Sequence, residues 1–406
     1  MAKKFVSFCA ASVMTLAAGA AMAAGTSKDP VKIGVLGDMS GVYAAGFSGP
    51  GAVAAVKMAV KDFGGTVLGR PIVVLSADHQ NKADVASTVA RQWIDVDKVD
   101  MITDLTNSAV ALAVQKLASD KHVITITDGA ASEALTGKSC TKYGIHYGYD
   151  THALSVGTAT AVVKSGGKSW FFITTDYAFG HALQANASGV VKRLGGTVVG
   201  SALAPLGTTD FSSYLLQAQA SKAQVIGLAN AGDDTINSIK QAHEFRIVQS
   251  GQQLAGMLVL VSDIKSLGVD TAKGLNFTTA WYWNHDAASR AWEQRFEKFS
   301  NGAAPTFVHA ADYSGTMAYL EAVKAAGTDN ADAVRAELGK MKINDFFAKD
   351  AHIRQDGVLM HNMYLLKVKS VADPKNPWDV ADVVREIPGK DAFFSLADSG
   401  CPLVKQ

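Results

Sequence analysis

Cysteine is scarce in this chain, and long apolar runs are missing beyond its first residues. The 406 residues contain three cysteines, of which Cys9 lies in the N-terminal stretch. The remaining pair, Cys140 and Cys401, is too small for a disulfide-rich scaffold or a structural zinc site. No later stretch reaches the roughly 20 apolar residues that span a bilayer. These absences exclude a membrane-spanning chain and a small cysteine-stabilised domain.

An excess of charge of either sign is also missing. The formal net charge at pH 7 is +1, and the N-terminal stretch carries Lys3 and Lys4 without an acid, so the remainder is close to neutral. Proteins that bind nucleic acids usually carry a strongly basic face. We therefore expect no nucleic-acid partner.

The motifs of common catalytic sites are missing as well. The chain has no G-x-S-x-G and no H-E-x-x-H. Residues 136–139 (TGKS) and 166–169 (GGKS) resemble the ends of phosphate loops, but Ser132 and Val162 occupy the positions of the required earlier glycine. The glycines of residues 34–41 lack G-x-G-x-x-G spacing. We expect a protein that is not an enzyme, with no cofactor and no metal.

The first 23 residues have the pattern of a secretory signal peptide. Two lysines precede the apolar stretch 5–16, and Ala21-Met22-Ala23 fits the small-x-small cleavage pattern. We expect residues 1–23 to be removed on export to the periplasm. In that oxidising compartment a single cysteine pair predicts a Cys140–Cys401 disulfide, with two buried free thiols as the alternative.

Short apolar segments alternate with helical segments twice along the chain. The first series of expected strands is 31–38, 71–78, 100–105 and 123–127, and the second is 169–175, 197–204, 223–230 and 254–262. These segments are apolar on both faces, which is typical of parallel strands covered by helices. Residues 351–370 alternate like antiparallel strands. The pattern predicts an α/β chain with two doubly wound parallel-sheet lobes.

Small polar residues follow several of the predicted strands. They occupy the loops 38–41, 106–108, 128–132, 176–180 and 230–233. In open α/β sheets, ligands bind outside the carboxyl ends of the strands. Each loop alone is compatible with ordinary helix capping, but their distribution over two lobes favours a ligand-binding cleft between the lobes.

Four segments resemble the type I periplasmic substrate-binding proteins of ABC transporters. They are "KIGVLGDMSG", "TNSAVALAVQKLASDKHVITITDGAASEALTG", "TTDYAFGHAL" and "KAQVIGLANAGDD", and the nearest branch is that of the leucine/isoleucine/valine receptors. The segments "TTAWYWNHD", "PTFVHAADYSG", "IRQDGVLMHNMYLLKVK" and "NPWDV" resemble a sub-branch often associated with plant-derived aromatic acids.

The resemblance implies two lobes that are joined by three crossovers and close on the ligand. The crossovers would fall near Asp150, Phe277 and Asp350. The first lobe would then combine residues 29–150 with 280–350. The second would combine residues 151–279 with 351–406.

The same resemblance implies how a ligand carboxylate is held. Ser108 at a helix start and the stretch from Gly129 through Ala130 to Ala131 match the positions that bind the carboxylate of amino-acid ligands. A threonine that meets the ligand ammonium is replaced here by Ala131, while Asp263 matches the acid from the second lobe. The chain thus retains the residues that would bind a ligand carboxylate, but it lacks one of the residues that would bind a ligand ammonium group.

Aromatic side chains are concentrated at two places beside the expected cleft. In an extended segment Trp281 and Trp283 share one side, and Tyr177 and Phe179 have the same spacing on the second lobe. These rings could hold a planar ligand, or the tryptophans could pack in the core or hinge. The full set of predicted ligand-binding residues is Ser40, Tyr43, Asn107, Ser108, Gly129, Ala130, Ala131, Tyr177, Phe179, Asn230, Asp233, Asp263, Trp281 and Trp283.

We expect a monomeric periplasmic receptor that captures a small organic acid and delivers it to inner-membrane permease subunits. The aromatic residues favour an aromatic carboxylate of hydroxybenzoate or phenylpropenoate type. A receptor for branched-chain amino acids and a ligand sensor for a signalling partner remain alternatives. The predicted signal peptide favours transport over a sensor fused to a membrane domain.

Overall fold

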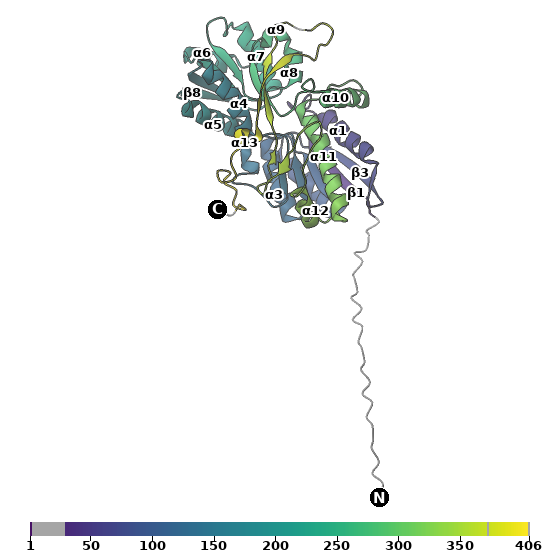
Figure 1. Ribbon diagram of the computed structural model, residues 1–406. Coiled ribbons are helices and arrows are strands. Elements are labelled where there is room, and N and C mark those ends of the chain that lie inside the picture. Colours follow the sequence, from purple (N-terminus) through teal and green to yellow (C-terminus); the bar gives the residue numbers. More distant parts are fainter. Residues whose placement is uncertain (2–28, 372, 405–406) are drawn as a thin grey trace.

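The chain folds into two α/β lobes with a small antiparallel sheet between them (Figure 1). The structure, a computed structural model, describes residues 29–371 and 373–404 together with Met1. The rest of the predicted signal peptide 1–23, including its cleavage site, lies outside the described residues. Within the described ranges no helix has the length and apolar character needed to cross a membrane.

The first lobe is built on a six-stranded sheet with the order β2-β3-β1-β4-β5-β6. Its strands are β1 (Val31–Gly37), β2 (Thr66–Val67), β3 (Arg70–Asp78), β4 (Met101–Asp104), β5 (Ile124–Thr127) and β6 (Gly144–His146). Its helices are α1 (Gly49–Phe63), α2 (Ala83–Gln92) with the π-helical turn η1 (Trp93–Asp97), α3 (Ser108–Asp120), the 3₁₀ turn η2 (Glu133–Leu135), α10 (Ala287–Phe299), α11 (Phe307–Ala326) and α12 (Ala331–Leu338). Strands β4 and β5 are buried at every position, as parallel strands with helices on both faces must be.

The second lobe is built on a four-stranded parallel sheet with the order β10-β9-β7-β8. Its strands are β7 (Ser169–Thr175), β8 (Thr197–Ala204), β9 (Val225–Ala229) and β10 (Gln253–Gly256). Its helices are α4 (Thr151–Lys164), α5 (Ala178–Arg193), α6 (Ser212–Ala220), α7 (Asp233–Glu244), α8 (Val261–Leu267) and α9 (Val269–Ala272). Strand β10 is shorter than the predicted 254–262, because the carboxylate of Asp263 accepts the amide of Leu260 and starts α8 there.

Three antiparallel strands run between the lobes, in the order β11-β14-β15. They are β11 (Asn276–Thr279), β14 (Met363–Val368) and β15 (Ala381–Ile387), which is followed by the short helix α13 (Gly389–Ala392). Strand β15 lies in the proline-containing tail and had no clear sequence pattern, because its middle is exposed at every position. Helix α4 approaches β11 closely, since a Cβ on Gly157 would lie 2.1 Å from Oγ1 of Thr278.

The predicted disulfide is present and fastens the C-terminal tail. Cys140 and Cys401, 261 residues apart, are bonded with their Cα atoms 5.6 Å from each other. The hairpin of β12 (His352–Ile353) and β13 (Leu359–Met360) precedes this tail, and His146 of β6 pairs with Val358 inside it. The lobe boundaries given above remain a prediction, but this part of the segment 351–406 contacts the first lobe.

Candidate ligand-binding site

A small, partly open pocket lies where the two lobes meet, with about 220 Å³ of space that is free of protein atoms and includes solvent at its opening. The first lobe contributes the turns after β4 and β5, and the second contributes the start of α5 and the turn after β9. This is the edge at which α/β sheets bind ligands. The residues that line the pocket are Tyr43, Phe47, Thr106, Asn107, Ser108, Gly129, Ala130, Ala131, Tyr149, Tyr177, Phe179, Ala231 and Leu258.

The first-lobe wall of the pocket offers hydrogen-bond donors that have no partner in the protein. The Oγ of Ser108 accepts the amide of Ser132 at 3.1 Å, so its own hydrogen is free to donate. Within the described part of the chain, the amides of Ala130 and Ala131 make no hydrogen bond to another protein group. These donors lie beside the N-terminus of α3, where the helix dipole favours an anion. The wall can therefore hold a carboxylate.

An unusual backbone conformation presents Ser108 to the pocket. Asp104, Leu105 and Asn107 have positive φ angles of 69°, 52° and 82°. The side chain of Asn107 compensates by capping α3, since its Oδ1 accepts the amides of Ala109 and Val110. Strained backbone of this kind persists where surrounding contacts enforce it, and it is common at ligand-binding sites.

Three buried carboxyl groups, those of Asp104, Asp128 and Asp312, interact with one another next to these turns. The backbone oxygen of Asp104 accepts the amides of Asp128 and Gly129, and its carboxylate accepts the hydroxyl of Thr106 at 2.6 Å. Burial raises the pKa of Asp104 to about 7 and that of Asp128 to about 8. Burial, reinforced by the two neighbouring acids, also raises the pKa of Asp312 well above its usual range. The cluster therefore retains protons near neutral pH and repels an anionic ligand less than three carboxylates would.

Aromatic rings form most of the remaining wall. Tyr149 is fixed because its hydroxyl donates to the backbone oxygen of Gly129 at 2.8 Å. Tyr177 and Phe179 come from the start of α5, with ring centroids 5.9 Å apart. Among the described residues that line the pocket, none carries a charged side chain. The pocket thus combines an anion-binding end with an uncharged aromatic interior.

Contacts between the lobes close the pocket. The hydroxyls of Tyr43 and Tyr177 lie 2.7 Å apart, and burial raises the pKa of both. The amide of Asp233 donates to the backbone oxygen of Val42 at 3.2 Å. This approach requires glycine at position 232, because a Cβ on Gly232 would lie 2.3 Å from the same oxygen. The two lobes are therefore in direct contact beside the pocket.

Several predicted binding residues lie outside this pocket. The hydroxyl of Ser40 donates to Asp78 at an exposed position. The side-chain amide of Asn230 donates to Ser238 and accepts from Thr235, both within the second lobe. Asp263 caps α8, and Asp233 contributes its backbone to lobe closure. The side chains of Ser40, Asn230 and Asp263 have partners elsewhere, and none of the four residues lines the pocket.

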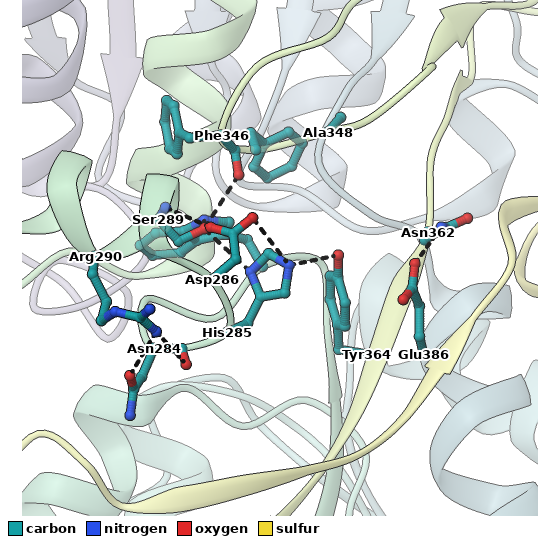
Figure 2. A network of polar contacts seen from close by, with 12 residues as sticks. Asn284, His285, Asp286, Ser289, Arg290, Phe346, Ala348, Asn362, Tyr364 and Glu386 are labelled. Carbon is teal, nitrogen blue, oxygen red and sulfur yellow. Dashed lines mark hydrogen bonds and ion pairs between the residues drawn. The ribbon is translucent and has the colours of Figure 1, made fainter.

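The aromatic triplet at 281–283 also lies outside the pocket, directly after β11 and near the predicted second crossover. The indole N–H of Trp281 donates to Ser289, and that of Trp283 donates to the backbone oxygen of Trp378. Figure 2 shows the polar network next to the triplet, in which the ring of His285 lies between Ser289 and Tyr364 of β14, at 3.1 and 3.2 Å. The network links residues 285–289 to β14, which runs between the lobes, and the triplet packs beside it.

The fold and site agree with a match to a known family. The family model described as "Periplasmic binding protein" matches residues 30–374. The chain belongs to this family. Its members bind substrates and are not enzymes, and the family places the protein in the periplasm as the binding component of an ABC-type transporter.

Individual relatives support the same assignment. A periplasmic binding protein from Burkholderia mallei is 51% identical, with a TM-score of 0.90 over 93% of this chain and 100% of that one. A branched-chain amino acid ABC transporter periplasmic ligand-binding protein from Burkholderia xenovorans is 40% identical, with a TM-score of 0.82 over 92% of this chain and 99% of that one. A Leu/Ile/Val-binding protein homolog from Brucella melitensis is 26% identical over 91% of this chain and 94% of its own.

A more distant member of the fold was solved with an aromatic acid. The solute-binding protein of an ABC transporter from Rhodopseudomonas palustris, in complex with 3,4-dihydroxybenzoic acid, has a TM-score of 0.80 at 22% identity, over 89% of this chain and 98% of that one. At this identity the likeness establishes the fold alone. The relatives therefore leave the ligand of this periplasmic binding protein open.

Sequence reasoning did not select every residue that lines the pocket. Phe47 and Leu258 have apolar side chains, and Tyr149 lies outside the polar loops that were selected, so the packing of distant segments is what brings these three to the pocket. Thr106 and Ala231 lie inside loops that were selected, next to residues that were named. The position of Tyr149, directly before the predicted first crossover, was the one available signal, because crossover residues of a two-lobed protein face the cleft.

Proposed function

We propose that this chain is the receptor of an ABC importer for a small aromatic carboxylate of hydroxybenzoate or phenylpropenoate type. One observation carries the proposal: unused donors stand at one end of the pocket, and the rest of its lining is uncharged and rich in aromatic rings. In the proposed complex, Ser108, Ala130 and Ala131 hold the carboxylate. Tyr149, Tyr177 and Phe179 surround the ring, and well-placed aromatic pairs each add roughly 0.5–1.5 kcal/mol beyond area burial.

The lining argues against an amino acid as the preferred ligand. A buried ammonium group needs an acidic or several neutral acceptors, because an unpaired buried charge is strongly destabilising. The nearest candidate acid by resemblance, Asp263, is buried and occupied by the amide of Leu260. The hydroxyl of Thr106 donates to Asp104, and its oxygen can still accept one hydrogen bond, which alone does not satisfy an ammonium group. An uncharged ring needs neither group.

A branched-chain amino acid is the second candidate, and it is favoured by the 40% identical relative named above. Calorimetry with 4-hydroxybenzoate, 4-hydroxycinnamate, leucine, isoleucine and valine separates the two. We expect at least one aromatic acid to bind and the three amino acids to bind far more weakly. Tight binding of leucine together with no binding of the aromatic acids would contradict the proposal. Native mass spectrometry of the freshly purified protein gives an independent reading of any ligand that it retains.

A further inference from the structure

The backbone oxygens of residues 129–131 all accept hydrogen bonds from one short segment. That segment is 146–151, which runs from the last residue of β6 to the first residue of α4. The three pairs, donor first, are the Tyr149 hydroxyl with Gly129 at 2.8 Å, Nε2 of His146 with Ala130 at 2.7 Å, and the Thr151 amide with Ala131 at 2.8 Å. Every carbonyl group of this stretch of the first-lobe wall is therefore held from the same side.

These bonds fix the direction of the amides that the wall offers to a ligand. A planar trans peptide directs its C=O and its N–H to opposite sides. A donor on the oxygen of Ala130 therefore sets the direction of the amide of Ala131, and a donor on the oxygen of Gly129 sets that of Ala130. Residues 129–131 line the pocket, and within the described part of the chain these two amides have no protein partner. The segment 146–151 thus holds the free amides on the side away from itself.

The next peptide repeats the pattern and includes Ser108. Its oxygen, that of Ala131, accepts the amide of Thr151, and its N–H, that of Ser132, donates to Oγ of Ser108. The hydroxyl of Ser108 is left with a hydrogen that it can donate. Hydrogen bonds in such a chain polarise one another. The segment 146–151 therefore strengthens the donors of the wall as well as orienting them.

His146 takes part in this arrangement without reaching the ligand pocket. Its side chain is buried and does not line the pocket, whereas the ring of Tyr149 does. A carbonyl oxygen can only accept, so Nε2 of His146 carries the proton and donates. Burial lowers the pKa of His146 to about 4, so the ring is uncharged at neutral pH. It acts on the wall as a hydrogen-bond donor and not as a positive charge.

We infer that His146 is a positioning residue for the ligand carboxylate, because its N–H holds the oxygen of Ala130 and so keeps the amide of Ala131 directed at the anion. The inference rests on the proposed function only in requiring a carboxylate at this wall, which an aromatic acid and an amino acid both supply. It adds a residue outside the pocket to the recognition of the anion. The site requires the donor, and glutamine at position 146 retains one.

The test compares carboxylate ligands with their neutral amides by calorimetry. The two pairs are 4-hydroxybenzoate with 4-hydroxybenzamide and leucine with leucinamide. His146→Leu should weaken binding of the carboxylate roughly tenfold and that of the amide only about twofold, because hydrogen bonds to charged groups contribute more than neutral ones. His146→Gln should restore most of the carboxylate affinity. A general loosening of the pocket would instead weaken both members of a pair by the same factor, and glutamine would restore neither.

The matched control removes a buried donor far from the pocket. Gln252 is buried in the second lobe, and its side-chain amide donates to the backbone oxygens of Ala218 and Ala223. Gln252→Leu leaves carbonyl groups without a donor, as His146→Leu does, and should bind every ligand as the wild type does. If His146→Leu does not fold, His146→Asn takes its place, because its polar side chain is too short to reach Ala130.

The outcomes separate the inference from the proposed function. Unchanged carboxylate affinity in the folded leucine or asparagine variant would overturn the inference and leave the proposed function intact. Equal losses for the two members of a pair, or a loss that glutamine does not reduce, would do the same. If the wild type binds leucine and not 4-hydroxybenzoate, the proposed ligand class is wrong, and the leucine pair then tests His146. If it binds neither carboxylate, both are wrong.

Discussion

The two lobes contribute different surfaces to the pocket, because the hydrogen-bond donors come from the first lobe whereas both lobes supply aromatic rings. The first lobe supplies backbone amides and the Ser108 hydroxyl, held by strained turns over buried acids. The second lobe supplies Tyr177, Phe179, Ala231 and Leu258. The donors of the first lobe exist without the second lobe, but the rings of the second lobe reach the pocket only when the lobes close. The first lobe can therefore bind the carboxylate and part of the ring, with Tyr43, Phe47 and Tyr149, and closure of the second lobe encloses the rest of the ring.

This difference suggests how binding is coupled to closure. An anion can dock on the open first lobe, and burial of its ring then favours the closed population, because a ligand shifts an equilibrium only through its differential affinity for the two states. Variants that act on one wall should change one step and spare the other. The following predictions test that separation, beginning with the largest expected effect.

A variant whose lobes cannot close should lose the contribution of the second lobe to the free energy of ligand binding. Gly232→Ala places a Cβ against the backbone oxygen of Val42, so the lobes cannot approach to their present distance. Loss of ring burial should weaken the binding of 4-hydroxybenzoate by about 3 kcal/mol, roughly a hundredfold. Calorimetry measures the affinity, and small-angle scattering should show that ligand no longer reduces the radius of gyration.

The control separates closure from backbone strain. Gly195 also has a positive φ angle, 76°, but a Cβ there meets nothing within 4 Å. Gly195→Ala should carry a similar conformational cost and yet close normally on ligand. If both variants bind as weakly as each other, strain and not the contact with Val42 explains the loss.

Removing the hydroxyl of Ser108 should damage the first wall alone. A hydrogen bond to a charged group contributes about 1.5–3 kcal/mol, so Ser108→Ala should weaken carboxylate binding roughly ten- to hundredfold. Scattering at saturating ligand should still show closure. Ser87→Ala on α2, whose hydroxyl donates to Ala83, is the matched control and should bind normally. Unchanged affinity in Ser108→Ala would mean that the carboxylate is held elsewhere.

The same contrast explains which parts of the site the sequence could predict. The donors of the first wall follow buried strands and begin helices, so Ser108 and residues 129–131 were found from local pattern and resemblance. Trp281 and Trp283 were selected because their rings could stack on a planar ligand. In the structure they lie outside the pocket, and their indole N–H groups donate to Ser289 and Trp378. Periodicity shows which side chains share a face, but it does not show what packs against that face.

The strands of the two parallel sheets were predictable for a related reason. Their apolar segments are buried on both faces and read as continuous runs, as in β4, β5 and β9. Strand β15 exposes most of its residues and carries no such run. Pairing with β14 holds it in place, and pairing between distant segments is not visible in local sequence.

The buried acids below the first wall should make stability depend on pH. The raised pKa values of Asp104, Asp128 and Asp312 mean that the folded state binds more protons than the unfolded state between about pH 4 and 8. Stability should therefore fall as the pH rises through that window. Asp312→Asn removes one ionisable group and keeps nearly the same side-chain shape, so the free energy of unfolding should depend less on pH. At pH 8 the variant should be more stable than the wild type, by roughly 1.4 kcal/mol for each unit of pKa shift removed.

Denaturant unfolding at pH 5 and pH 8 measures this effect. The exposed Asp270, replaced by asparagine, is the control and should leave the slope unchanged. If the free energy of unfolding of Asp312→Asn depends on pH as steeply as that of the wild type, then ionisation of Asp312 does not destabilise the folded state. The carboxyl groups next to the first-lobe wall would then be charged at neutral pH.

The smallest expected effect concerns the hydrogen bond that joins the two walls. Tyr177→Phe keeps the ring of the second lobe but removes the bond to the hydroxyl of Tyr43. A neutral hydrogen bond contributes about 0.5–1.5 kcal/mol, so the affinity for 4-hydroxybenzoate should fall roughly two- to tenfold. Tyr43→Phe should have a similar effect, and the double variant should lose little more than either single variant, because both remove the same bond. Calorimetry on the three variants gives the coupling energy. If the losses in binding free energy of the two single variants add in the double variant, each hydroxyl contacts the ligand separately. Recognition of the ring would then include hydrogen bonds from both lobes.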